Sequence, residues 1–134
     1  LDTLERGGNL PKTVLYSLNP ADNAWIDTLL GAFQGPEVPG KIQHGSAWWF
    51  NDHKAGMTEH LTSLANLSIL GNFIGMLTDS RSLLSYARHE YFRRVLCALL
   101  GRWVENGEYP NDLETVGGLV ADICYRNAKR YFNL

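Results

Sequence analysis

This sequence has no large excess of positive or negative charge, no long apolar run and few cysteines. The longest hydrophobic stretches fall short of the roughly 18 residues that a membrane-spanning helix needs. Lys and Arg number 12 and Asp and Glu 14, for a net charge of −2, so no general attraction to nucleic acid is expected. The two cysteines, Cys97 and Cys124, lack CxxC spacing, which favours free, buried thiols in a reducing compartment over a disulfide. We therefore expect a cytoplasmic protein without membrane or nucleic-acid partners.

Alternating strand-like and helix-like segments are what the chain does contain. Its 134 residues, 45% of them hydrophobic, suit one globular domain. Short β-rich runs are each followed by apolar residues at helical spacing. The predicted strands are Thr13–Leu18, Lys41–Gly45 and Phe73–Asp79.

Capping signals predict where the helices begin and end. Asn19-Pro20 is a favourable helix start, and Gly71-Asn72 is a typical helix end. A long helix is predicted over about Ser82–Val104, and a terminal helix is predicted to begin at Asn111, with Glu114 completing a capping box. The buried stripe of the long helix is predicted to consist of Leu84, Ala87, Tyr91, Val95 and Ala98.

The order of these elements predicts an α/β fold with parallel strands and crossover helices. Three strand–helix units plus a terminal helix fit either a small open α/β domain or about three eighths of a (β/α)8 TIM-type barrel. Composition does not separate the two architectures. In both, chemistry is expected where the strands end, here at Asn19, His44–Asn51 and Thr78–Arg81.

Asp79 and Arg81 are the first candidates for that chemistry. On an extended chain, residues two apart point to the same face. A carboxylate there can ligate a metal or move a proton, and a guanidinium can grip a carboxylate or oxyanion. The competing interpretation is an Asp or Ser helix cap with an Asp–Arg ion pair. Spacing alone leaves both open.

The stretch HGSAWWFNDH (His44–His53) is the second candidate. Because Trp48, Trp49 and Phe50 would cost solubility if exposed, some of them are expected to be buried. The stretch is either a loop that plugs the core or the wall of a ligand pocket, with indole groups against a sugar ring. No HxH or HExxH spacing occurs, so the histidines are expected to be structural or surface groups.

Three long stretches resemble the C-terminal part of bacterial uronate isomerase, also called glucuronate isomerase. They are VPGKIQHGSAWWFNDHKAGM, GMLTDSRSLLSYARHEYFRRVLC and ICYRNAKRYF. The resemblance runs from about Leu10 to Phe132. The chain departs from the common pattern at His44 and Ala47, where many relatives carry Phe and Gly.

The resemblance implies membership of the amidohydrolase superfamily and a (β/α)8 barrel. It implies the isomerisation of D-glucuronate to D-fructuronate and of D-galacturonate to D-tagaturonate in hexuronate catabolism, through an enediol. Asp79 matches a catalytic carboxylate and metal ligand at the end of the eighth strand, and Arg81 matches a catalytic arginine that binds substrate. Trp48 or Trp49 matches an aromatic residue near the sugar. The full-length enzyme is implied to hold a divalent metal, with zinc as one candidate.

The same resemblance makes residues 1–134 a single partial domain, with strands like the sixth, seventh and eighth of the barrel. The family's HxH motif and the residues of the earlier strands are missing. We therefore expect the isolated chain to be inactive, to hold no metal by itself, and to need a hexuronate and the N-terminal portion of the same barrel as partners. The alternatives are a non-enzymatic, self-associating barrel fragment or binding module, and a hydrolase of the same superfamily.

Overall fold

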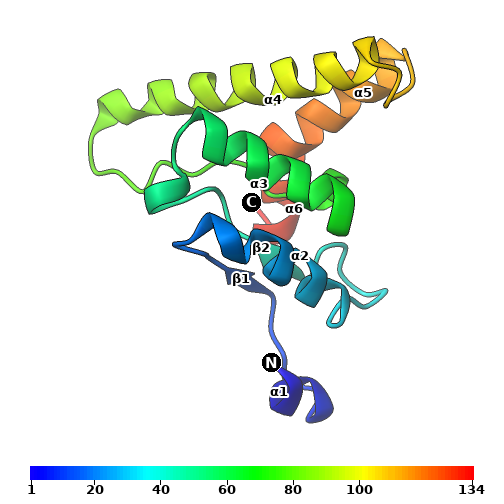
Figure 1. Cartoon of the computed structure of the whole chain (residues 1–134). Helices are drawn as coiled ribbons and strands as arrows, with labels where there is room; N and C mark the ends of the chain where they lie inside the picture. The colour runs from blue at the N-terminus through cyan, green and yellow to red at the C-terminus, as the bar shows by residue number, and fades with distance from the viewer.

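A parallel pair of short strands stands at the start of the fold. The structure is a computed structural model that describes all 134 residues. Strands β1 (Thr13–Leu15) and β2 (Ile42–His44) pair in parallel, with Leu15 opposite His44. Helix α2 (Asn23–Gly31) is the crossover between them, as Figure 1 shows. The predicted α/β strand–helix–strand unit is confirmed, with strands shorter than predicted.

The predicted third strand, Phe73–Asp79, is not a strand in the structure, and the sheet has two strands. Gly75 (φ 82°) and Asp79 (φ 46°) take left-handed conformations that break an extended run. A Cβ on Gly75 would lie 2.3 Å from the backbone oxygen of Ile123. The Asn127 amide donates to the first carbonyl of the segment at 2.9 Å. The 73–79 segment therefore packs against the C-terminal helical region instead of pairing with β2.

Helices form most of the remaining structure. In Figure 1, α3 and α4 run side by side, α5 descends from the far end of α4, and α1 projects away from the body. The fully buried core includes Leu30 of α2, Leu61 of α3, Leu96 of α4 and Ile123 of the C-terminal region. The bounds of the helices other than α2 are α1 Asp2–Arg6, α3 Lys54–Leu67, α4 Ala87–Glu105, α5 Leu113–Ala121, the π-helical η5 Asp122–Arg126 and α6 Asn127–Phe132.

The buried stripe predicted for the long helix is wrong except at Val95. Leu84 is 88% exposed because the helix opens with a 3-10 turn, Leu83–Tyr86, and α4 begins only at Ala87. A 3-10 turn has three residues per turn, so its side chains are out of phase with the α-helix that follows. Further along, Tyr91 and Ala98 are exposed too, each one residue away from the buried face. That face consists of Phe92, Val95, Leu96, Leu99 and Leu100.

One predicted helix start is confirmed and one is displaced. The Asn19 side chain accepts from the Ala21 N–H at 3.1 Å, where a 3-10 turn leads into α2. The cap of α5 is Asp112, not Asn111, and its Oδ1 accepts from the backbone N–H groups of residues 114 and 115 at 3.1 Å. Aspartate serves here because an ionised carboxylate accepts several N–H groups at once.

The predicted helix end, the cysteines and the membrane expectation have different outcomes in the structure. Helix α3 ends at Leu67, and Gly71-Asn72 lies in a separate 3-10 turn. Both cysteines are free, as predicted, but Cys97 is exposed and Cys124 is only partly buried. No helix has the length and apolar character required to span a membrane.

Candidate functional site

Two of the predicted site residues meet in space. The Trp48 indole Nε1–H donates to Asp79 Oδ2 at 2.8 Å, across 31 residues of sequence. Trp48 follows β2 by four residues, and Asp79 lies at the end of the 73–79 segment. The contact therefore joins the loop after β2 to the end of the 73–79 segment, two of the places where the sequence predicts chemistry.

Tyr16, which sequence reasoning missed, supports the Trp48 indole. Its ring lies edge-on to the Trp48 ring, with 5.5 Å between centroids. A Cβ on Gly45 would lie 2.3 Å from the Tyr16 ring, so glycine is what lets the ring approach β2. Burial, and then the charge of Asp79, raises the pKa of the Tyr16 hydroxyl above its usual value. Its place directly after β1, at the end of a strand, is the signal that could have identified it.

Asp79 opens onto a shallow polar cavity of about 420 Å³. Its left-handed backbone (φ 46°) is unusual for a residue other than glycine. Such conformations persist where the surrounding structure holds them, often at functional sites. The carboxylate is exposed, and only Oδ2 accepts a hydrogen bond within the chain. The cavity is lined by Met76, Leu77, Thr78, Asp79, Ser80, Arg81 and His89.

The competing cap-and-ion-pair interpretation is confirmed in its Ser cap, while the Asp–Arg ion pair does not form. The side chain that caps the next turn is Ser82, whose Oγ accepts from the Leu84 N–H at 3.3 Å. None of the seven ion pairs in the chain includes Asp79 or Arg81. Arg81 is exposed and lines the same cavity as Asp79. Its guanidinium is therefore available to an anionic ligand.

Trp49 is placed differently from Trp48. It has a left-handed backbone (φ 50°) and is 63% exposed, and Phe50 beside it is 72% exposed. The expectation that some of these aromatic residues are buried is met only in part, because Trp48 is half-buried and the other two are exposed. The Trp49 ring packs edge-on against the Trp48 ring, with centroids 5.9 Å apart.

Metal-ligating groups do not converge in this chain. No three His, Cys, Asp or Glu side chains lie together in a way that fits a metal ion. His53 accepts from the Gly56 N–H at the start of α3, and His44 and His60 are buried, so the structural interpretation of the histidines holds. Asp79 offers one carboxylate oxygen without a partner, which is too few donors for a divalent cation. The residues present do not fit a metal site by themselves.

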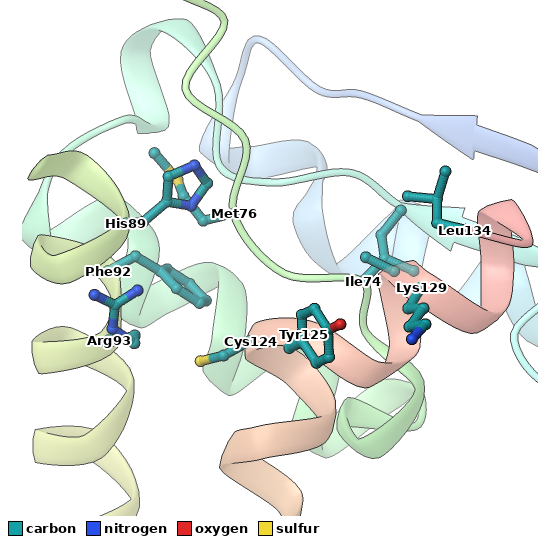
Figure 2. Close-up of a pocket in the computed structure, with 10 residues that line it drawn as sticks. Ile74, Met76, His89, Phe92, Arg93, Cys124, Tyr125, Lys129 and Leu134 are labelled. Atoms are coloured by element: carbon teal, nitrogen blue, oxygen red, sulfur yellow. The ribbon is translucent and has the colours of Figure 1, made fainter. Parts of the chain in front are cut away.

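A second cavity, of about 410 Å³, borders the 73–79 segment at Ile74 and Met76 (Figure 2). Figure 2 shows Phe92 and Arg93 of α4 on one side, Tyr125 and Lys129 of the C-terminal helical region on the other, and the segment between them. Its lining is mostly apolar. It shares only Met76 and His89 with the Asp79 cavity and contains none of the predicted site residues.

Comparisons with known proteins agree on one family. The sequence model of glucuronate isomerase matches residues 1–132. The chain is 66% identical over 132 residues to a uronate isomerase of Lachnoclostridium phytofermentans, and 63% identical over 134 residues to one of Clostridium acetobutylicum. It also superimposes on the crystal structure of uronate isomerase from Thermotoga maritima, with a TM-score of 0.85 and 39% identity.

These matches cover nearly all of this chain but a small part of each relative. The alignments include 98% and 100% of the chain, against 28% and 29% of the two enzymes. The structural match includes 98% of this chain and 28% of the Thermotoga protein. The chain thus spans about 28% of the length of the relatives it matches. On the strength of the family match over residues 1–132, the chain belongs to the glucuronate isomerase family.

Proposed function

We propose that this chain acts as part of a uronate isomerase, which interconverts D-glucuronate with D-fructuronate and D-galacturonate with D-tagaturonate. The observation that carries the proposal is the match to the family over residues 1–132. The hydrogen bond between Trp48 and Asp79 supports it, because it places an oriented carboxylate beside an open polar cavity.

Asp79 and Arg81 take the two central roles in this proposal. Aldose–ketose isomerisation moves a proton from C2 to C1 through an enediol, with no net change in composition. A positioned carboxylate such as Asp79 can carry that proton. Arg81 binds the uronate carboxylate or the developing oxyanion, since a guanidinium makes paired hydrogen bonds to such groups. Trp48 holds one carboxylate oxygen, leaving the other to face the cavity.

The architecture proposed for the whole enzyme is a (β/α)8 barrel, in which β1, β2 and the 73–79 segment correspond to the sixth, seventh and eighth strands. Every strand of a closed barrel pairs with a neighbour on each side, which satisfies its backbone groups. The 73–79 segment has none in this chain, and we expect it to straighten when the rest of a barrel pairs with it. The divalent metal, zinc among the candidates, would then take most of its ligands from that remainder.

A chimeric enzyme tests the proposal. This chain replaces the aligned 132 residues of the Lachnoclostridium phytofermentans uronate isomerase, to which it is 66% identical. The chimera is expected to form D-fructuronate from D-glucuronate, whereas the isolated 134-residue chain is expected to form none. A folded chimera without activity would contradict the proposal.

Asp79→Asn in the chimera tests the assigned role. Loss of a group that transfers a proton typically slows a reaction by about 100-fold or more, so kcat is expected to fall by at least about 100-fold. The matched control is Asp22→Asn, the same change of carboxylate to amide at an exposed residue beside α2. Equal kcat values for the two variants would remove Asp79 from the mechanism.

Self-association is a second candidate property of the isolated chain. Leu83 and Leu84 are 77% and 88% exposed, and Trp25 is 67% exposed. The mostly apolar cavity of Figure 2 is also open. Exposed apolar surface of this kind favours association. Light scattering on the purified chain is expected to show species larger than 15.0 kDa, and a stable monomer at all concentrations would exclude this property.

A further inference from the structure

A buried carboxylate ties together helices α2 and α3 and strand β2, the strand that precedes Trp48. Asp27 of α2 is fully buried, and its two oxygens have separate partners. His44 Nδ1, at the end of β2, lies 2.7 Å from Oδ1, and Ser63 Oγ of α3 lies 2.5 Å from Oδ2. Because a carboxylate only accepts hydrogen bonds, both neighbours donate. These three residues are called the Asp27 network.

Such a network holds its elements in one arrangement. A buried carboxylate that lost either donor would be left with an unmet acceptor, at a cost greater than that of an exposed hydrogen bond. The strand end at His44 therefore cannot slide or rotate relative to α2 and α3 without breaking a buried contact. Gly45 and then Trp48 follow within four residues.

The network also reaches the segment that carries Asp79. The His44 ring packs edge-on against the ring of His60, with centroids 4.4 Å apart, and His60 packs against Phe73 at 5.3 Å. Phe73 is 2% exposed and begins the 73–79 segment. A buried column of rings thus runs from the end of β2 to the start of the segment that ends at Asp79.

We propose that the Asp27 network positions the Trp48 indole for its hydrogen bond to Asp79. These are positioning residues, since none of the three lines the cavity that contains Asp79. The importance of the network for catalysis rests on the function proposed above. The positioning itself does not, because it concerns a hydrogen bond that is measured without substrate.

Fluorine NMR of the 134-residue chain labelled with 5-fluorotryptophan measures that bond directly. The chain has four tryptophans, and the Trp48 signal is assigned as the one lost in Trp48→Phe. Asp79→Ala supplies the chemical shift of Trp48 without its acceptor. In Asp27→Ala, which removes the centre of the network, the Trp48 signal is expected to move at least halfway toward the Asp79→Ala position.

Two comparisons separate positioning from general loss of structure. The spectra are recorded at a temperature at which circular dichroism shows every variant to be folded. The control variant Asp22→Asn changes an exposed carboxylate beside the same helix and is expected to leave the Trp48 signal at its wild-type position. Asp27→Asn keeps an acceptor facing His44, so its Trp48 signal is expected to lie close to the wild-type position. A Trp48 signal that stays at the wild-type position in folded Asp27→Ala would overturn the proposal.

Milder variants decide the matter if Asp27→Ala does not fold. Ser63→Ala removes one of the two donors, and His44→Gln keeps a polar group of smaller reach. Each is expected to move the Trp48 signal in the same direction by a smaller amount, and unchanged signals in both would overturn the proposal. A chimera that lacks isomerase activity while these shifts occur would refute the proposed function and leave the positioning intact.

Discussion

Acidification is expected to destabilise the protein through His60. This side chain is 2% exposed, and its Nε2 has no hydrogen-bond partner. Burial, and then the neighbouring His44 ring, lowers the pKa of His60 from 6.5 to about 3, and a backbone contact at Gly45 opposes the change only in part. In the unfolded chain the same imidazole is in water and titrates near its ordinary value.

The direction of the effect follows from which state binds the proton. Between pH 6.5 and about 3 the unfolded chain is protonated at His60 and the folded chain is not. The free energy of unfolding therefore falls as the pH drops through this window, by about 1.4 kcal/mol per pH unit. The full contribution is present above pH 6.5. At about pH 5 the expected loss is about 2 kcal/mol, a large share of a typical domain's stability.

Urea unfolding across a pH series measures this loss. The variant His60→Gln keeps a polar side chain that cannot take up a proton, so the difference between wild type and variant isolates His60 from other titrating groups. Several chain concentrations reveal any contribution of self-association. The wild type is expected to lose about 2 kcal/mol more than the variant between about pH 7.5 and 5. Parallel curves for the two proteins would refute the reasoning.

Three substitutions, two of them with a matched control, test the packing by urea unfolding. Gly75→Ala forces a left-handed alanine whose Cβ lies 2.3 Å from a backbone oxygen, so a loss above about 2 kcal/mol is expected; Gly101→Ala in α4 meets no atom within 4 Å and is expected to gain about 0.5–1 kcal/mol. Asn127→Ala strips the donor from two carbonyls, bonded at 2.7 and 2.9 Å, for a loss of about 2 kcal/mol; a loss near zero would mean that water replaces the amide. Leu96→Ala in the core is expected to lower the free energy of unfolding by about 3 kcal/mol, whereas Leu84→Ala is expected to change it very little. Equal losses for the two variants would mean that Leu84 is buried, as the sequence pattern predicts.

Residue patterns within a short stretch of sequence predicted the strand–helix–strand unit and one helix cap. The strand–helix–strand unit around β1, α2 and β2 follows from short β-rich runs next to residues at helical spacing, and it forms as predicted. The Asn19 cap forms as well, because its hydrogen bond lies within three residues. The stripe was misplaced at Leu84 because a 3-10 turn precedes Ala87. Within α4 it was misplaced at Tyr91 and Ala98 because the buried face lies one residue further along, at Phe92 and Leu99.

Contacts between distant residues were beyond the reach of these signals. Phe73–Asp79 has the composition of a strand, yet its conformation depends on Asn127, more than 50 residues later. Asp27 is an acidic residue in a helix, and nothing near it in the sequence indicates that its partners are His44 and Ser63. Burial of a carboxylate is a property of the packed elements, so the sequence pattern of α2 alone does not reveal it.

The candidate site combines both kinds of information. Asp79 and Arg81 were predicted from their place at the end of an apolar run and from the resemblance to uronate isomerase, while the spacing alone also allowed a cap with an ion pair. In the structure Ser82 provides the cap that the second interpretation allowed, Asp79 accepts from the Trp48 indole, and the role of Asp79 and Arg81 in catalysis stays a prediction. A carboxylate that served only as a cap would point its oxygens at backbone N–H groups of the following turn. Asp79 instead lines an open cavity and has one oxygen without a partner in the chain, which suits a group that meets a ligand.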